Sequence, residues 1–325
     1  MTTPWPVPDL ADVLAARQRI APYLRPTPLY GYPALDAVTG ARVLVKHENH
    51  QPVGAFKVRG GVNLISQLTP DERARGVIAA STGNHGQSVA YAAGLFGVRA
   101  VICVPERANP VKVESMQALG AEVVFHGRDF DEAREHCEKQ AAEHRYRYIH
   151  SGNEPSLITG VATGTLEILE ARPDTDVIVV PVGGGSGAAG ACVVAKAVRT
   201  SVEVIGVQSE AAPAAYRSWR AGSLVEDTNS TFAEGLATRT AFELPQLILR
   251  ELLDDFVLVS DDALKAATRL MIEKTRNLVE PAGAAALAAV LAEPGRYAGR
   301  SVAIVCSGGN ISPAQLAQLW PPGTP

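Results

Sequence analysis

Lys57 stands in a glycine-rich turn that could present a reactive amine. The segment Gly54–Gly61 places Phe56 directly before this lysine, and a helical pattern starts at Lys57 itself. Because a helix N-terminus carries partial positive charge, a cation there is misplaced for stability, and a lowered pKa would favour the nucleophilic, neutral amine. Most lysines are solvated surface groups, so roughly nine in ten would have no such role. Taken alone, Lys57 is a weak candidate.

A second glycine-rich turn follows the apolar run Val177–Val182 and precedes a helical pattern. Glycines let backbone N–H groups gather around an anion, and the helix N-terminus adds a favourable dipole. The turn therefore predicts a phosphate-binding site formed by Gly183, Gly184, Gly185, Ser186 and Gly187. Together with Gly190, its glycines also match G-x-G-x-x-G, and Glu210 closes the next strand, as a dinucleotide fold requires. From this pattern alone, a nicotinamide cofactor and a simple phosphate ester both remain open.

Two polar turns also follow strand patterns. Ser81–Gln87 collects hydroxyl, amide and backbone donors at a helix start, which suits a carboxylate. The same residue types serve only as helix caps in roughly half of such turns, and His85 alone would more often be structural. Ser307–Asn310 places a serine where a strand ends, although a plain connection explains it equally well.

Alternating strand and helix patterns must bring these turns together. The expected strands are Arg42–Lys46, Val77–Ser81, Ala100–Val104, Glu122–His126, Tyr146–Ile149, Val177–Val182, Val204–Gln208, Phe256–Val259 and Val302–Cys306. The expected helices are Lys57–Leu68, His85–Phe96, Val111–Leu119, Asp131–His144, Ser156–Glu170, Leu244–Leu253, Asp261–Lys274 and Gly283–Leu291. Since the strands are apolar throughout, they predict parallel sheets covered on both faces. Ligands of such sheets bind at the carboxyl ends of the strands, where the polar turns lie.

In this order, the segments Gly-Ala-Phe-Lys57, STGNHGQ, GGGSG and CSGGN resemble the fold-type-II pyridoxal-phosphate enzymes, in particular the serine/threonine dehydratase and serine racemase group. Pro26–Leu29 and Glu280–Ala284 extend the resemblance over nearly the whole chain. It implies an α/β fold of the tryptophan synthase β type, with two open, twisted sheets of parallel type in two domains. The large cofactor-binding domain would comprise residues 1–75 and 152–325, and a small α/β domain of residues 76–151 would be inserted into it.

The resemblance also gives each turn a role. Lys57 would hold pyridoxal 5'-phosphate as a Schiff base, Phe56 would pack beside its ring, and Ser307 would face its pyridine nitrogen. Asn84 would hydrogen-bond the phenolic oxygen, and residues 183–187 would hold the phosphate. The substrate carboxylate would bind Ser81, Thr82, Asn84 and His85.

The implied reaction is an elimination with Lys57 as general base at the substrate Cα. A serine at the pyridine nitrogen is a far weaker acid than a carboxyl group, so the ring is a poorer electron sink, which favours loss of a β-hydroxyl over transamination. The product, an aminoacrylate, hydrolyses to a 2-oxo acid and ammonia. We therefore predict a dehydratase (ammonia-lyase) for threonine, serine or a related 3-hydroxy amino acid. Serine-type racemisation is the alternative, with Thr82 as the acid on the opposite face, and a nicotinamide-dependent oxidoreductase is a more distant one.

Three departures from the group bear on substrate and metal. Gly152 stands where the group often has a bulkier residue, and Val161-Ala162 replaces a Gln-Gly pair, so the wall of the substrate pocket can differ. Gln208 and Ala214 stand where the racemases carry an acidic pair for a divalent cation. We therefore expect no metal site.

Composition limits the other possibilities. The 325 residues are 46% hydrophobic and 20% charged, with a net charge of −4 and a pI near 6.0, which argues against nucleic acid or anionic lipid as a partner. The N-terminus lacks the pattern of a signal peptide, and no apolar run is long enough to span a membrane. The four cysteines form no CxxC pair and indicate reduced core residues. We expect a cytoplasmic enzyme, a homodimer by resemblance. Because the sequence ends soon after Trp320, we also expect no regulatory domain and hence a catabolic role.

Overall fold

The computed structural model describes residues 5–320. The segment in which we predict no signal peptide therefore lies partly outside the described residues. The strands are β1 (Leu29–Gly31), β2 (Arg42–His47), β3 (Val77–Ala80), β4 (Ala100–Val104), β5 (Glu122–Phe125), β6 (Arg147–Tyr148), β7 (Val177–Pro181), β8 (Glu203–Ser209), β9 (Asp255–Val259) and β10 (Ser301–Cys306). Every expected strand is present, and its ends agree with the prediction to within one residue.

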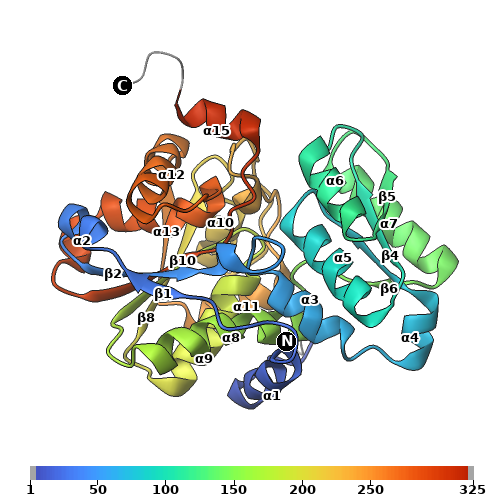
Figure 1. Ribbon diagram of the computed structural model, residues 1–325, viewed down its shortest axis with the longest axis horizontal. Helices are drawn as coiled ribbons and strands as arrows, with labels where there is room; N and C mark the ends of the chain where they lie inside the picture. Colours follow the sequence, from blue (N-terminus) through green and yellow to red (C-terminus); the bar gives the residue numbers. More distant parts are fainter. Residues whose placement is uncertain (1–4, 321–325) are drawn as a thin grey trace.

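Helices alternate with these strands along most of the chain (Figure 1). The longer helices are α1 (Leu10–Ile20), α3 (Val58–Ile65), α5 (Asn84–Phe96), α6 (Pro110–Ala118), α7 (Phe130–His144), α8 (Pro155–Ala171), α9 (Ser186–Val198), α10 (Ala214–Ala221), α11 (Glu243–Leu252), α12 (Asp261–Thr275) and α13 (Pro281–Ala292). The shorter ones are α2 (Pro33–Thr39), α4 (Pro70–Arg75), α14 (Pro294–Tyr297) and α15 (Pro313–Leu319), with single 3-10 turns at Glu48–His50 and Glu234–Leu236. Proline opens several of them, where its missing N–H costs no hydrogen bond.

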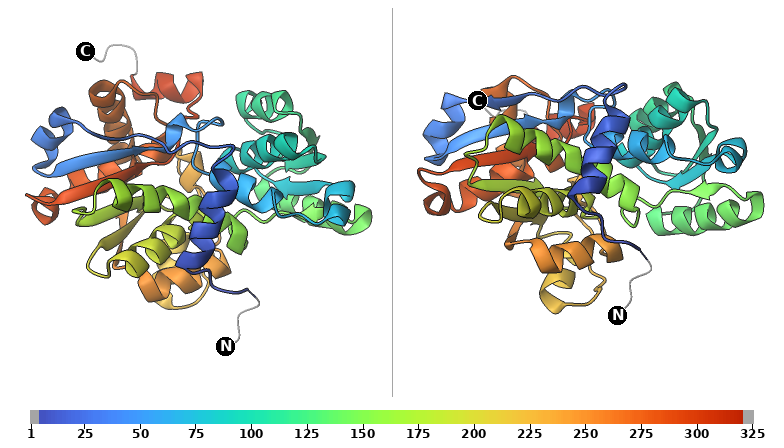
Figure 2. Two further views of the ribbon diagram at one scale, coloured as in Figure 1. Left: turned by 60° about the horizontal axis from the view of Figure 1, so that its bottom comes forward. Right: turned by 90° about the horizontal axis from the view of Figure 1, so that it is seen from below.

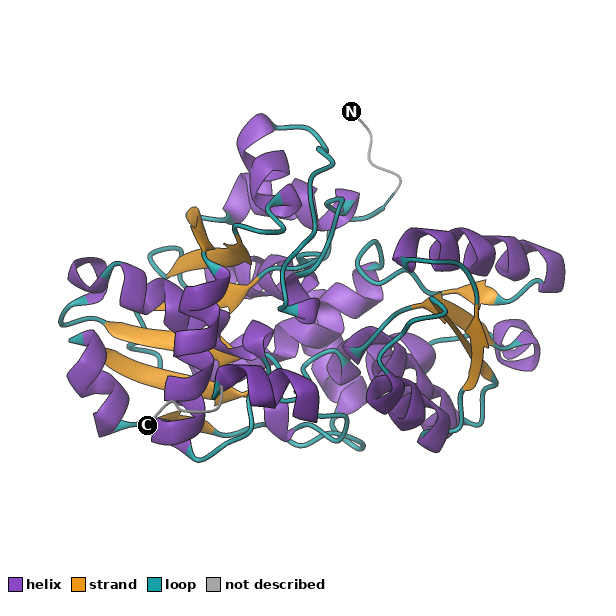
Figure 3. Cartoon of the chain, turned by 90° about the horizontal axis from the view of Figure 1, so that it is seen from above, coloured by secondary structure: helices purple, strands orange, loops and turns teal. Residues whose placement is uncertain are grey.

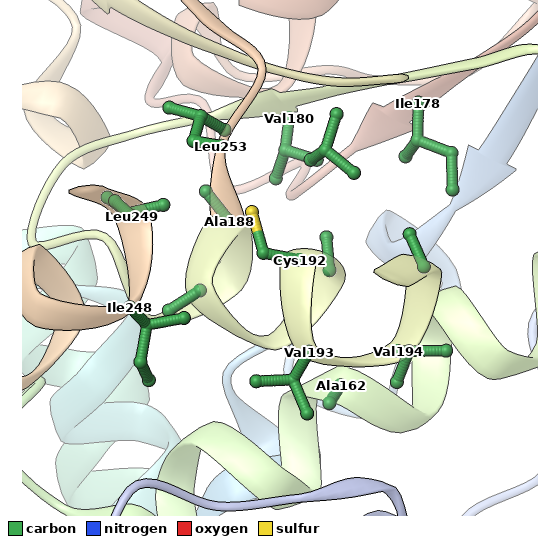
Figure 4. Packing of buried hydrophobic residues seen from close by; sticks show 14 of the residues in the cluster. Ala162, Ile178, Val180, Ala188, Cys192, Val193, Val194, Ile248, Leu249 and Leu253 are labelled. Atoms are coloured by element: carbon green, nitrogen blue, oxygen red, sulfur yellow. The ribbon is translucent and has the colours of Figure 1, made fainter. Parts of the chain in front are cut away.

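The larger sheet has six strands in the order β1-β2-β10-β7-β8-β9. All neighbours pair in parallel except β1, which pairs antiparallel with β2 at the edge. The helices α8, α9 and α11 cover one face, and α12 and α13 cover the other (Figure 1). In Figure 4, Cys192 and Val193 of α9 lie among Val180 of the sheet, Ala162 of α8 and Leu249 of α11. The predicted parallel sheet with two covered faces is therefore confirmed.

The smaller sheet has four parallel strands in the order β5-β4-β3-β6. Alternate residues of β3 and β4 pack toward α5 and α6 or toward α7. Figures 2 and 3 show the two sheets apart from one another, with helices between them. The division into domains at residues 75/76 and 151/152 stays a prediction, although the smaller sheet lies within residues 76–151.

Helix α3 lies between the two sheets (Figure 1), packed on α5 of the smaller layer and on α8 of the larger. Its residues are all buried. The contact with α8 needs glycine on both sides: a Cβ on Gly60 would lie 2.9 Å from the Leu157 carbonyl oxygen, and one on Gly160 would lie 2.5 Å from the Arg59 carbonyl oxygen. The residue that precedes α3 is Lys57, so both sheets determine its position.

All cysteines are buried and free. Among the helices of residues 5–320, none combines the length and apolarity needed to cross a membrane.

Candidate active site

The amine of Lys57 lies at the predicted turn after β7. Its Nζ donates to the Ser186 hydroxyl at 2.9 Å and to the Ser151 carbonyl at 3.1 Å. Within residues 5–320 it forms no salt bridge with a carboxylate. Burial lowers the pKa of Lys57 to about 8, because desolvation disfavours the charged ammonium. The amine is therefore available in its neutral form near physiological pH.

The turn before Lys57 is joined to the turn after β10. The backbone N–H of Phe56 donates to the Ser307 carbonyl at 3.0 Å, and Ala55 forms a β-bridge with Gly308. Gly54 has a φ of +66°, and a Cβ there would lie 2.6 Å from the Asn310 amide oxygen. Ser307 is buried and borders a small cavity together with the Phe56 ring. The structure thus brings together Phe56 and Ser307, which are far apart in the sequence.

The turn at residues 183–187 leads from β7 directly into α9. Gly185 has a φ of +90° and caps the helix, which leaves the first N–H groups of α9 without intrahelical partners. A Cβ on Gly183 would overlap the Gly235 carbonyl, and one on Gly187 would lie 3.1 Å from the Phe56 ring. This is the geometry of an anion cradle beside Phe56. Gly190, the last glycine of the dinucleotide-type pattern, instead permits close packing of α9 on Ala162 of α8.

The turn at residues 81–87 begins α5. Ser81 accepts hydrogen bonds from the backbone of Gly83 at 3.1 Å and Gly86 at 2.9 Å, while Thr82 stays half-buried at its tip. His85 is buried, its Nε2 lies 3.3 Å from the Ile149 carbonyl, and its Nδ1 has no partner within the described residues. Burial, and then the nearby charge of Lys57, lower the pKa of His85 to about 3. His85 is therefore neutral and can offer a carboxylate its backbone N–H, not a charge.

Asn84 has a fully determined orientation. Asn310 donates both hydrogens of its amide nitrogen, one to the Val53 carbonyl and one to the Asn84 amide oxygen, each at 2.8 Å. Asn84 must therefore present its own amide nitrogen to Glu280 Oε1, at 2.7 Å. Since a primary amide carries two hydrogens, one remains for a ligand oxygen.

Glu280 completes this series of hydrogen bonds. The sequence includes it in the motif Glu280–Ala284 but did not predict it as a site residue. It is buried, and burial raises its pKa. A Cβ on Gly308 would overlap its carboxyl group, so glycine is needed there. Glu280 therefore fixes the orientation of the Asn84 amide.

A buried group of charges fixes α3 and was also missed. Arg59 contacts Glu48 at 2.7 Å and Glu167 at 2.6 Å, and Lys46 contacts Glu167 at 2.5 Å. Thr27 donates to Glu48 at 2.6 Å. Two positive and two negative side chains balance one another, which is what makes their burial tolerable. Arg59 lies two residues after Lys57, so this cluster holds Lys57 in place.

Two ion pairs join the smaller sheet layer to the larger beside the site. Lys112 of α6 pairs with Glu234, and its amine lies 3.5 Å from where a Cβ on Gly83 would be. Arg239 pairs with Asp131 of α7 at 3.2 Å. Both pairs link the layer that carries the 81–87 turn to segments near the glycine cradle.

These residues fit pyridoxal 5'-phosphate. A buried amine without a carboxylate partner and with a lowered pKa suits covalent attachment of an aldehyde. The glycine cradle at the start of α9 suits the phosphate, and the remaining hydrogen on Asn84 suits a ring oxygen. Phe56, Ser307 and the cradle border one another, as a flat ring between them requires.

Comparison with known proteins agrees with this fit. Residues 20–308 match the family model "Pyridoxal-phosphate dependent enzyme". The chain is 38% identical to the L-threonine ammonia-lyase of Thermotoga maritima over 93% of this chain and 75% of that protein. It is 36% identical to the L-threo-3-hydroxyaspartate ammonia-lyase of Saccharomyces cerevisiae over 96% of each. The structure of maize serine racemase superimposes with a TM-score of 0.91 at 31% identity, covering 96% of this chain and 97% of that one. The chain belongs to the pyridoxal-phosphate-dependent enzyme family, in agreement with the resemblance of its motifs.

Proposed function

We propose that the protein is an ammonia-lyase that converts a short β-hydroxy amino acid, such as threonine, serine or 3-hydroxyaspartate, to a 2-oxo acid and ammonia. The observation that carries this proposal is the buried Lys57 amine, whose pKa is lowered to about 8 and which lies between Ser186 of the glycine cradle and the Ser151 carbonyl. The relatives named ammonia-lyases support the reaction class.

The substrate would be held at two places. Ser81, Thr82 and the first N–H groups of α5, at Asn84 and His85, would bind the α-carboxylate, because donors and a helix N-terminus favour an anion. The cradle at residues 183–187 would hold the cofactor phosphate, with Phe56 beside the ring, Ser307 at its nitrogen and Asn84 at its phenolic oxygen. When bound, the cofactor supplies an electron sink for the pair left on the substrate Cα.

Lys57 would remove the Cα proton, since a neutral amine with a pKa of about 8 is a competent base near neutral pH. The Cβ–O bond then breaks, and the hydroxyl leaves as water with one proton, which balances the proton that Lys57 removed from Cα. The resulting enamine takes up that water in hydrolysis, so the net products are the 2-oxo acid and ammonia. Racemisation is a second candidate because Thr82 is a half-buried hydroxyl in the turn at the start of α5, and the fold matches a serine racemase closely.

The purified enzyme tests this proposal directly. We expect absorption in the violet from cofactor bound to Lys57, loss of that band on borohydride reduction, and the added mass on the peptide that carries Lys57. A Lys57→Ala variant should lack the label and lose roughly 10²–10⁴-fold in rate, the range for loss of a positioned base. A screen of β-hydroxy amino acids for 2-oxo acid release, with chiral analysis of the remaining substrate, separates elimination from racemisation. A colourless wild-type protein that yields no 2-oxo acid would contradict the proposal.

We further propose a homodimer in the cytoplasm. The buried, free cysteines support a reducing compartment. Sedimentation analysis tests the oligomeric state.

A further inference from the structure

Phe242 fills the space between the two segments that accept hydrogen bonds from Lys57. Its ring lies against Gly152 and Gly184, where a Cβ on either glycine would overlap the ring. The carbonyl just before Gly152 and the hydroxyl two residues after Gly184 are the two acceptors of the Lys57 amine. The ring is half-buried and lies between these two segments.

The position of this ring is tightly constrained. Gln246 donates its backbone N–H to the Phe242 carbonyl at 3.0 Å in the first turn of α11. The His150 ring packs edge-to-face on Phe242, with centroids 4.7 Å apart and an interplanar angle of 82°. His150 Nδ1 in turn accepts from the backbone of Gly152 at 3.1 Å and Asn153 at 2.9 Å. A small shift of the ring would therefore meet backbone on both sides.

The groups around the Phe242 ring carry no charge. Because Nδ1 of His150 accepts two hydrogen bonds, its hydrogen must be on Nε2. Burial, and then the charges of Lys57 and Arg134, lower the pKa of His150 to about 4, so the imidazole is uncharged near neutral pH. We call Gly152, His150 and Phe242 the side-chain wall. It consists of an aromatic ring, a neutral imidazole and a residue without a side chain.

We propose that the side-chain wall limits the substrate to short β-hydroxy side chains, and that Phe242 sets the limit. The inference rests on the proposed function. With the substrate α-amine near Lys57 and its carboxylate on the 81–87 turn, the substrate side chain would face the side-chain wall. The Phe242 ring already occupies the space beside residues 151–153. It fits there only because residue 152 is a glycine. A side chain of the size of threonine is accepted, and one that carries its own aromatic ring is excluded.

The test compares threonine with 3-phenylserine, in which a phenyl group replaces the methyl group, on wild-type and Phe242→Ala holoenzyme. Removal of the Phe242 ring leaves a space of phenyl size, so the ratio of kcat/KM for threonine over 3-phenylserine should fall at least about tenfold. The change should lie mainly in the KM for 3-phenylserine. The matched control is Phe96→Ala: Phe96 is half-buried on α5 and contacts Tyr23 and Arg73 instead of the site, so the ratio should not change.

Two further readouts do not depend on turnover. Equilibrium binding of both amino acids, followed by the cofactor absorbance, should show the same change in preference. Gly152→Ala should lower Tm in the wild-type background, where its Cβ overlaps the ring, and should cost much less in the Phe242→Ala background. Should Phe242→Ala not fold, Phe242→Leu shortens the same side chain and allows the same comparison.

An unchanged preference in the folded Phe242 variant, or an equal loss of Tm from Gly152→Ala with and without the ring, overturns the inference. So does a wild-type enzyme that binds 3-phenylserine as well as threonine. If the wild type releases no 2-oxo acid from any amino acid, the proposed function fails, and the binding and Tm comparisons still decide the role of Phe242.

Discussion

Ser186 lies 2.9 Å from the amine of Lys57, so the first residue of α9 accepts a hydrogen bond from the lysine that precedes α3. Ser186 also belongs to the glycine cradle, which means that one helix N-terminus serves both the amine and the anion site. Because the partners of Lys57 are a neutral hydroxyl and a neutral carbonyl, nothing compensates the ammonium for its burial, and its pKa falls to about 8.

The attachment of pyridoxal phosphate to the cofactor-free protein should follow this pKa. Only the neutral amine attacks an aldehyde, and its fraction rises about tenfold per pH unit below the pKa and levels off above it. We expect the rate of attachment, measured from the visible absorbance, to rise up to a pH of about 8 and then flatten. Free N-α-acetyl-lysine is the reference, and its rate should still rise toward a pH of about 10. A protein rate that keeps rising in parallel with this reference would contradict a lowered pKa.

Substitutions of Glu280 should separate hydrogen bonding from charge. Burial raises the pKa of this carboxyl, and its role toward Asn84 is that of an acceptor. Glu280→Gln keeps an acceptor oxygen of the same reach, so cofactor affinity should stay close to that of the wild type. Glu280→Leu leaves the Asn84 amide unsatisfied, which costs roughly 1–3 kcal/mol of stability, and it frees this amide to turn away from the cofactor, so cofactor binding should weaken. Titration of both apo variants with cofactor measures the difference, and equal losses would rule out this role.

Removal of Arg59 should strongly destabilise the fold. Arg59→Leu leaves Glu167 with Lys46 as its cation and Glu48 with only the Thr27 hydroxyl, and breaking a buried pair from one side costs about 3–5 kcal/mol. Urea unfolding of the cofactor-saturated enzyme measures the free energy. The control is Arg99→Ala, because Arg99 pairs with Glu122 on the surface and exposed pairs contribute little. Similar losses of unfolding free energy in the two variants would show that the buried cluster contributes no more to stability than an exposed ion pair.

Thr82→Ala should abolish racemisation and spare elimination, because only racemisation needs an acid on the second face of Cα. Thr82→Ser keeps the hydroxyl and should retain whatever racemisation the wild type has. Chiral analysis of unreacted serine, alongside 2-oxo acid release, gives both rates from one reaction. An equal fall of both in Thr82→Ala would mean that this residue has another role.

Local patterns predicted the elements well because buried parallel strands are short apolar runs that end in polar turns. The three-residue strand Leu29–Gly31 was missed, since it is partly exposed and pairs antiparallel at an edge. The helix Leu10–Ile20 was also missed, although Asp9 and Asp12 form a capping box at its start.

The turns of the site were found for the same reason, each lying at a strand end. Their supporting residues could not be found in that way. Arg59 meets Glu167 across 108 residues of sequence, and Phe242 meets Gly152 from a different part of the chain. The hydrophobic pattern around each of these residues does not indicate a partner so far away in the sequence. For Gly152, the sequence indicated only that the wall of the substrate pocket can differ, and not which residue lies against it.

Helix α3 is attached to both sheet layers by hydrogen bonds between buried groups. Ser88 of α5 donates to the Lys57 carbonyl at 2.7 Å, and Asn63 donates to the Ser156 carbonyl at 2.8 Å, so this helix is bonded to both layers through buried groups. The ion pair between Arg239 and Asp131 is far more exposed, and mobile ions screen such pairs. Ionic strength therefore weakens this ion pair between the two layers and leaves the buried hydrogen bonds of α3 unaffected.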